Sequence, residues 1–211
     1  MVITYYGMEF FKVQFGDLTL AINPISKDSK LKGARFGAQV ALVSMNDVDL
    51  NGLEQVSFGD KIPFSITGPG EYEVKDVFIK GISSGTNASG KLNTMYTITL
   101  EGMNIVFLGA LASKDLSSEI KGALPDIDIL FVPIGGGEVL TASESYKLAV
   151  SLEPKLIIPM HYSDDKDGLN ALKVFLKEAG AEKAEALEKL TLKKKDLDGK
   201  EGEIIVLAPA V

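Results

Sequence analysis

The chain has 211 residues, of which 24% are charged and 45% hydrophobic, a composition typical of a soluble globular domain. Its 22 basic and 29 acidic residues give a formal net charge of -7, which argues against a basic face for nucleic acid or anionic lipid. Cysteine is absent and there is one histidine. Disulfides, thiolate nucleophiles, Cys-ligated metal sites and any mechanism that needs two imidazoles from one chain are therefore excluded.

We expect neither a targeting segment nor a membrane span. Residues 1–7 carry no basic region and no apolar stretch of signal-peptide length. Apolar runs such as 127–134 and 156–160 fall far short of the ~20 residues that a membrane-spanning helix needs. Without cysteines suited to an oxidising compartment, the expected location is the cytoplasm.

The first half of the chain is predicted to form β-strands. Short β-branched and aromatic runs alternate with turns that contain glycine or proline. The run at 40–44 is apolar throughout, as expected for a strand that is covered on both faces. The predicted strands are 2–6, 10–15, 18–22, 40–44, 61–67, 74–83, 95–101 and 105–108.

The second half is predicted to alternate helices with buried strands. Thr141 and Glu144 form a capping-box pattern that opens a helix running to about Leu152. The other predicted helices are 113–124 and 168–179, the buried strands are 127–133 and 156–160, and a closing hairpin joins 190–194 to 203–207. This order favours an α+β fold, an αββα four-layer sandwich that forms a single domain over residues 1–211.

Several short motifs follow one another in a recognisable order. Gly7-Met8-Glu9 separates the first two strands, and residues 21–24 read Ala-Ile-Asn-Pro. A buried strand then leads into segment 44–50, and 157–162 reads Ile-Ile-Pro-Met-His-Tyr. Over residues 1–165 this series resembles the metallo-β-lactamase superfamily, in particular its short stand-alone hydrolase-like members. The resemblance implies an αββα sandwich and hydrolysis by a water molecule that one or two zinc ions activate.

The segment that would carry the family's zinc-binding signature departs from it. The family places Thr-His-x-His-x-Asp-His here, whereas this chain reads Ser-Met-Asn-Asp-Val-Asp-Leu. Met45 and Asp47 stand where the first two histidines would be, Asp49 matches the aspartate, and Leu50 replaces the last histidine. Thioether and alkyl side chains are poor ligands for zinc, so we expect this segment to have lost most of its metal affinity.

The remaining ligand positions are also changed. Ala110 replaces the aspartate that bridges two metals in the family, and the loop at 84–90 contains no histidine. His161 alone keeps its counterpart, the last ligand histidine. The resemblance therefore implies a vestigial pocket of Asp47, Asp49 and His161, from which the dinuclear zinc site has been lost.

Two functions follow from this pattern. The main interpretation is a non-catalytic protein without a cofactor, which binds a protein partner or self-associates as a homo-oligomer. The alternative is a metal-dependent hydrolase with a reduced mononuclear site at Asp47, Asp49 and His161, which binds one Zn²⁺, Mn²⁺ or Mg²⁺ weakly. An apolar plug at the old site favours the first, and an open cleft with converging side chains favours the second.

Two other features are predicted to be structural. Gly135-Gly136-Gly137 follows a buried strand and could cradle an anion, but it lacks the lysine and serine or threonine of a phosphate-binding loop. We expect it to allow tight passage from strand to helix. Lys193-Lys194-Lys195 is expected to be the solvated edge of the closing hairpin.

Overall fold

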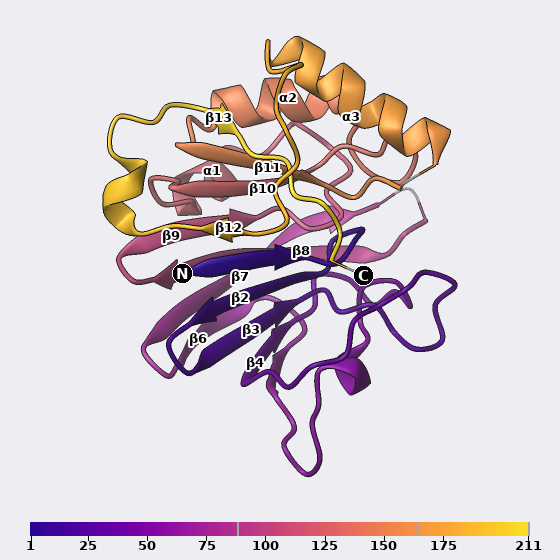
Figure 1. Ribbon diagram of the computed structural model, residues 1–211, viewed down its shortest axis with the longest axis vertical. Coiled ribbons are helices and arrows are strands. Elements are labelled where there is room, and N and C mark those ends of the chain that lie inside the picture. Colours follow the sequence, from indigo (N-terminus) through magenta and orange to yellow (C-terminus); the bar gives the residue numbers. More distant parts are fainter. Residues whose placement is uncertain (88, 164, 211) are drawn as a thin grey trace.

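The protein is a sandwich of two β-sheets with its α-helices on one outer side (Figure 1). The structure, a computed structural model, describes residues 1–87, 89–163 and 165–210. The two mixed sheets and the few helices confirm the α+β sandwich that the order of elements predicts.

The described strands fall into two groups. The first sheet contains β1 (Val2–Tyr5), β2 (Phe11–Phe15), β3 (Leu18–Ile22), β4 (Val40–Leu42), β5 (Phe64–Ile66) and β12 (Leu190–Thr191). The second sheet contains β6 (Gly70–Val74), β7 (Val77–Thr86), β8 (Leu92–Leu100), β9 (Met103–Phe107), β10 (Ile129–Pro133), β11 (Leu156–Met160) and β13 (Glu203–Ile204). The α-helices are α1 (Ser118–Ala123), α2 (Ala142–Ser151) and α3 (Lys166–Glu178), and the 3-10 helices are η1 (Leu53–Gln55) and η2 (Lys194–Leu197).

Each sheet combines antiparallel with parallel strands. The first sheet runs β12-β1-β2-β3-β4-β5, and the second runs β13-β11-β10-β9-β8-β7-β6. In the first, β3, β4 and β5 are parallel, and in the second, β9, β10, β11 and β13 are parallel. The carboxyl ends of these strands therefore lie together at one edge of each sheet, where loops can build a site.

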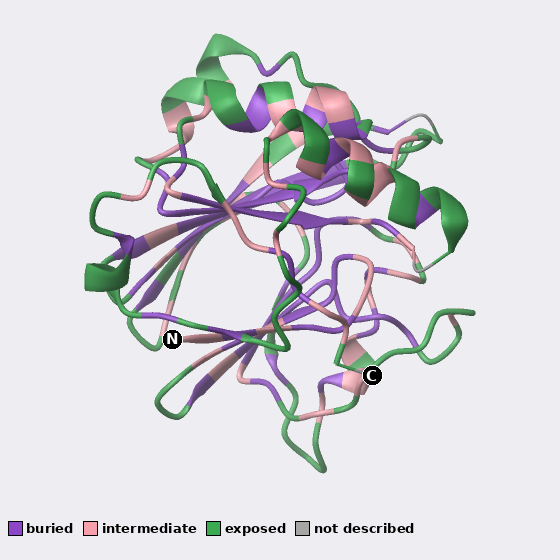
Figure 2. Cartoon of the chain, turned by 45° about the horizontal axis from the view of Figure 1, so that its top comes forward, coloured by how far each residue is buried: buried purple, intermediate pink, exposed green. Residues whose placement is uncertain are grey.

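The main hydrophobic core lies between the two sheets (Figure 2). In β2, Phe11 and Val13 are buried while Lys12 and Gln14 are partly exposed, the period-two pattern of a strand with one inner face. The ring centroids of Phe11 and Phe131 lie 4.6 Å apart in an edge-on arrangement, which joins the two sheets across the core.

The outer faces of the sandwich are covered differently. The helices α2 and α3 pack on the second sheet, where they bury Leu148 and Phe175 against β10 and β11. Both strands are buried at every position because sheet and helices cover them on opposite faces. The outer face of the first sheet is covered by segments 23–39 and 51–57, which include η1.

The predicted closing hairpin is wrong, because its two strands belong to different sheets. β12 pairs antiparallel with β1, whereas β13 pairs parallel with β11. Between them η2 buries Leu197 completely and redirects the chain from one sheet to the other. Lys193–Lys195 accordingly lies at η2 and not at a hairpin edge, and the Lys193 N–H donates to the Asp196 carboxylate at 2.7 Å.

A second difference concerns residues 74–83, for which the sequence predicts one strand. The chain turns at Lys75 and Asp76, both at positive φ (52° and 62°), so that β6 and β7 form a hairpin. Two central residues at positive φ match the twist of paired strands, but glycine or asparagine normally marks such turns. Aspartate tolerates this conformation, but lysine gives no such signal.

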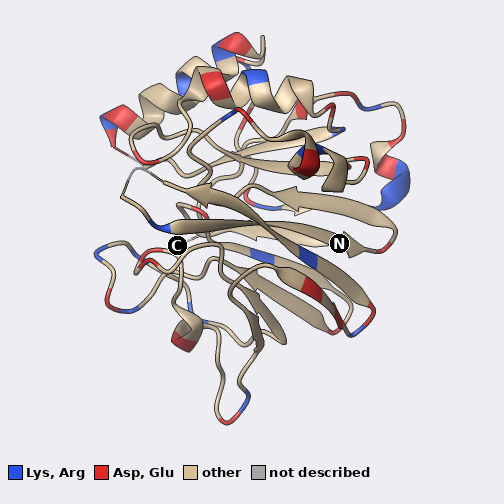
Figure 3. Cartoon of the chain, turned by 180° about the vertical axis from the view of Figure 1, so that it is seen from behind, with Lys and Arg blue, Asp and Glu red and all other residues tan. Residues whose placement is uncertain are grey.

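The surface of the described chain mixes both signs of charge. Lysines alternate with acidic residues over the helices and the loops (Figure 3). In the part of the chain that the structure describes, no helix has the length and apolarity that a membrane crossing requires.

The capping box of α2 yields a stability prediction. The Thr141 side chain accepts the Glu144 N–H, and the Glu144 carboxylate accepts the Thr141 N–H at 3.0 Å. We expect Thr141→Ala to lower the free energy of unfolding by about 1 kcal/mol, because it leaves an N-terminal N–H of the helix without a partner. Urea denaturation followed by circular dichroism measures the change. An unchanged midpoint would contradict the prediction.

Candidate functional site

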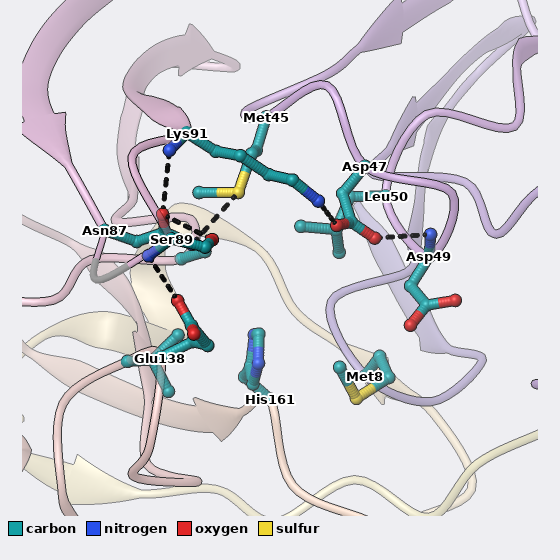
Figure 4. Close-up of a pocket in the computed structure, with 12 residues that line it drawn as sticks. Met8, Met45, Asp47, Asp49, Leu50, Asn87, Ser89, Lys91, Glu138 and His161 are labelled. Carbon is teal, nitrogen blue, oxygen red and sulfur yellow. Dashed lines mark hydrogen bonds and ion pairs between the residues drawn. The ribbon is translucent and has the colours of Figure 1, made fainter.

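A cavity of about 320 Å³ opens at the carboxyl ends of the parallel strands. Its walls come from the turn after β1, the segment after β4, the β7–β8 loop, and the segments that follow β9, β10 and β11. The lining residues are Met8, Met45, Asp47, Asp49, Leu50, Asn87, Ser89, Lys91, Ala110, Glu138, Val139 and His161 (Figure 4).

His161 enters this cavity from the end of β11. It directly follows the strand at a positive φ of 57°, and its N–H donates to the Met8 carbonyl oxygen at 2.6 Å. Its Nδ1 lies 2.5 Å from Oε1 of Glu9. Because Nδ1 is engaged there, Nε2 is the ring nitrogen that remains for the cavity, into which the ring points (Figure 4).

Glu9 is fully buried and is held by two donors. Beside His161, the Asn23 side-chain amide donates to Oε2 of Glu9 at 2.6 Å. The same amide donates to the Ser44 hydroxyl, and the Ser44 N–H donates to Oδ1 of Asn23 at 2.7 Å. This network connects the β1–β2 turn, the end of β3 and the segment after β4.

Asp47 is already engaged by a cation. Its Oδ2 forms an ion pair with Nζ of Lys91, and its Oδ1 accepts the Asp49 N–H at 2.9 Å. Burial alone would raise the pKa of the Asp47 carboxyl, but the hydrogen bonds from Lys91 and from the Asp49 N–H lower the pKa below its usual range. The same contact raises the pKa of Lys91.

Asp49 reaches the cavity from the same segment but has its own partner. Its Oδ1 accepts a hydrogen bond from the Ser29 hydroxyl at 2.5 Å. Asp49 lies near enough to Lys91 to favour the charged ammonium electrostatically.

The three residues that replace family ligands form an apolar wall. Met45, Leu50 and Ala110 are buried and pack with Val139 in one hydrophobic cluster. Asn87 donates to the sulfur of Met45 at 3.7 Å, which fixes the thioether in this wall. The cavity therefore combines an apolar wall with an open polar side.

The donor set does not fit a dinuclear zinc centre. Among the residues that the structure describes, no three His, Asp or Glu side chains converge on one metal position. Asp47, Asp49 and His161, the three residues of the predicted vestigial pocket, all line this one cavity. Two carboxylates and one oriented imidazole therefore line the cavity, but among the described residues they do not form a ready-made metal centre.

The sequence reasoning missed three charged residues of the site. Glu9 stands in the noted turn Gly7-Met8-Glu9, but its contact with His161 spans 152 positions of the chain. Lys91 and Glu138 lie in loops without a motif, and Glu138 accepts the Ser89 N–H at 3.0 Å. The one signal that could have found these residues is their charge, in loops that lie next to the segments of the family motif.

Gly135 has the structural role expected for its segment. A Cβ atom at this position would overlap the carbonyl oxygen of His161, so only glycine permits this close approach. The glycine segment thus helps to place the histidine.

Comparison with known proteins identifies the family. A family described as the beta-lactamase superfamily domain matches residues 2–161. A UPF0173 metal-dependent hydrolase from Listeria innocua is 29% identical over 144 residues, which cover 64% of this chain and 59% of that protein. One from Natranaerobius thermophilus is 28% identical over 103 residues, which cover 48% of this chain and 45% of that protein. These matches thus span about half of those relatives' length.

Solved structures extend the likeness to nearly the whole chain. A putative Zn-dependent hydrolase of the metallo-β-lactamase superfamily from Thermotoga maritima is 28% identical, with a TM-score of 0.79 over 98% of this chain and 97% of that one. A metallo hydrolase from Ignicoccus hospitalis, 17% identical with a TM-score of 0.64 over 99% of this chain and 95% of that one, shares the fold.

These names correct two expectations. The relatives are named metal-dependent hydrolases, and the Thermotoga protein is named Zn-dependent. The interpretation of this chain as a non-catalytic binding or self-associating protein is therefore wrong, as is the expectation that it needs no cofactor. The error came from treating missing family ligands as missing chemistry. The chain belongs to the beta-lactamase superfamily and has the metallo-β-lactamase fold.

Proposed function

We propose that this chain is a metal-dependent hydrolase that uses one weakly bound divalent ion in the cavity of Asp47, Asp49 and His161. The observation that carries the proposal is the contact between Glu9 and His161. Histidines that bind metals commonly donate their second ring N–H to a carboxylate, which fixes the tautomer and the ring orientation. Here a fully buried carboxylate lies 2.5 Å from Nδ1 and leaves Nε2 for the cavity.

The donor chemistry favours a single ion such as Mn²⁺ or Mg²⁺. These ions are often held by one or two carboxylates and complete their shell with water. A tetrahedral zinc site needs three or four protein ligands, which the described side chains do not bring together. When bound, such an ion lowers the pKa of a bound water and polarises the group under attack.

The protein's own residues set the substrate class. Three carboxylates, on Asp47, Asp49 and Glu138, face one ammonium and one imidazole across the cavity. With one divalent ion bound, the ammonium and the ion would offset the three carboxylates, so the cavity would favour a substrate without net charge. The apolar wall suits a hydrocarbon group. The volume of about 320 Å³ lies at the small end of ligand pockets. We therefore propose a small neutral ester or amide as the substrate.

Location and assembly are also proposals. We propose a cytoplasmic protein that forms one domain over residues 1–211 and acts without nucleic acid or membrane. The net charge of -7 supports the absence of nucleic-acid binding. A homo-oligomer is proposed as its assembly, to be measured by light scattering.

Metal uptake tests the proposed function directly. We expect untagged protein to bind one Mn²⁺ ion. A titration monitored by the electron paramagnetic resonance signal of free Mn²⁺, which is lost on binding, measures this. Asp49→Asn and His161→Gln should each weaken this binding, because each removes a ligand. Asp17→Asn, in the exposed β2–β3 turn at the opposite ends of the strands, is the matched control and should leave it unchanged. Protein that binds no Mn²⁺ would contradict the proposal.

The role of Glu9 is tested on the one histidine of the chain. Nitrogen NMR of the imidazole, followed over a pH titration, should place the single proton of the neutral ring on Nδ1, because Glu9 accepts that proton's hydrogen bond. Glu9→Gln should shift this tautomer and weaken Mn²⁺ binding about 10- to 100-fold. A proton on Nε2 in the unmodified protein would sink this role for Glu9, whatever the effect of the substitution on folding.

A further inference from the structure

A small hairpin, residues 58–62, projects from one end of the molecule. Phe58 and Lys61 pair through two backbone hydrogen bonds of 3.0 and 3.1 Å, and the turn between them opens on Gly59 at a positive φ of 57°. This projecting hairpin links η1 to β5 and is the purple loop at the bottom of Figure 1. Residues 58–62 are all exposed (Figure 2), so a well-formed turn stands in water.

The projecting hairpin carries large apolar side chains. Phe58 is 70% exposed and Ile62 is 81% exposed, and Phe64 at the start of β5 is 49% exposed. The ring centroids of Phe64 and of Tyr72 on β6 lie 6.4 Å apart in an edge-on arrangement, which connects the hairpin to the side of the sandwich. Together Phe58, Ile62 and Phe64 leave about 400 Å² of apolar surface in water, an area typical of interaction sites.

The same tip carries one charge of each sign. Asp60 and Lys61 are neighbours and both are exposed, and the tip shows an acidic next to a basic residue in Figure 3. Neither side chain has an ion-pair partner within the described chain. A twofold axis sets each acidic group against the basic group of the other copy, so a tip with both charges is complementary to itself.

We propose that the projecting hairpin and Phe64 form a twofold interface with a second copy of this chain, in which Asp60 faces the partner's Lys61. This inference rests on the homo-oligomer proposed above and names the surface that would form it. A standard interface buries about 800 Å² of each partner, of which a little over half is apolar. The apolar surface of Phe58, Ile62 and Phe64 matches that apolar share.

The neighbouring sheet edges are protected from pairing with another chain. β5 and β6 are the last strands of the first and second sheets, and such edges can add a strand from a partner. However, β5 has three residues and follows Pro63. β6 follows Pro69 and carries Glu71 and Glu73, and short strands, proline and charge all discourage edge pairing. The contact we propose is therefore made by side chains of the hairpin.

Sedimentation equilibrium of untagged protein over a wide range of concentrations tests the interface. We expect a dimer whose dissociation constant rises about tenfold or more in Phe58→Ser and in Ile62→Ser, because each dimer loses two buried apolar side chains. Leu169→Ser is the matched control and should change nothing. It alters a 53% exposed position on α3, at the opposite end of the molecule (Figure 1).

A charge exchange tests the twofold pairing itself. Asp60→Lys sets two ammonium groups against each other and Lys61→Asp sets two carboxylates against each other, so each should weaken the dimer about fivefold. The double variant restores opposite charges and should return the dissociation constant to that of the unmodified protein. Because the two single substitutions change the net charge in opposite directions, an effect of net charge alone would have opposite signs.

The other outcomes overturn the inference in distinguishable ways. A dimer that Phe58→Ser and Ile62→Ser leave unchanged would overturn this surface and keep the proposed homo-oligomer. A double charge variant as weak as the single variants would overturn the pairing of Asp60 with the partner's Lys61. A monomer at every concentration would overturn both the inference and the proposed homo-oligomer, while the metal site is decided by its own Mn²⁺ titration. Circular dichroism of each variant shows that the compared proteins are folded.

Discussion

The site depends on a buried carboxylate. Glu9 has no exposed surface, and a polar group in such a place is tolerated only if it has hydrogen-bond partners. Asn23 and His161 are those partners, each from the end of a different sheet. Met8, Asn23 and His161 all adopt positive φ, a conformation that non-glycine residues rarely take. The backbone at the three strand ends is thus shaped around one buried carboxyl group, which positions the imidazole in the cavity.

A second charge balance lies on the other side of the cavity. Asp47 is partly buried and would be costly to ionise, yet the Lys91 ammonium and the Asp49 N–H keep its pKa low. Another wall of the cavity is apolar and contains Met45, Leu50 and Ala110. Apolar side chains at these positions need no cation to balance them. The carboxylates that remain at the cavity, such as Asp47, have a partner within the protein. The charged groups of the cavity are therefore balanced by the protein's own residues.

The fold was predictable because its signals are local and repeated. The buried runs of β10 and β11 and the capping box at Thr141 and Glu144 each follow from a few neighbouring residues. The hairpin at Lys75-Asp76 and the separation of β12 from β13 were not predicted. The first depends on a turn without its usual residues, and the second on which distant strand each short segment meets. Local pattern does not encode a partner that lies far away in the sequence.

The same limit explains the error about function. A ligand signature is compared position by position, so it reveals which ligands are missing. In that comparison His161, Asp47 and Asp49 are only the remnants of a metal site. The structure adds residues from outside the signature, since Glu9 orients the histidine and Lys91 neutralises an aspartate. A metal site is defined by the charge and orientation of everything that surrounds it, including the groups behind its ligands. Because those groups come from loops that only folding brings together, the loss of a signature cannot by itself establish the loss of an activity.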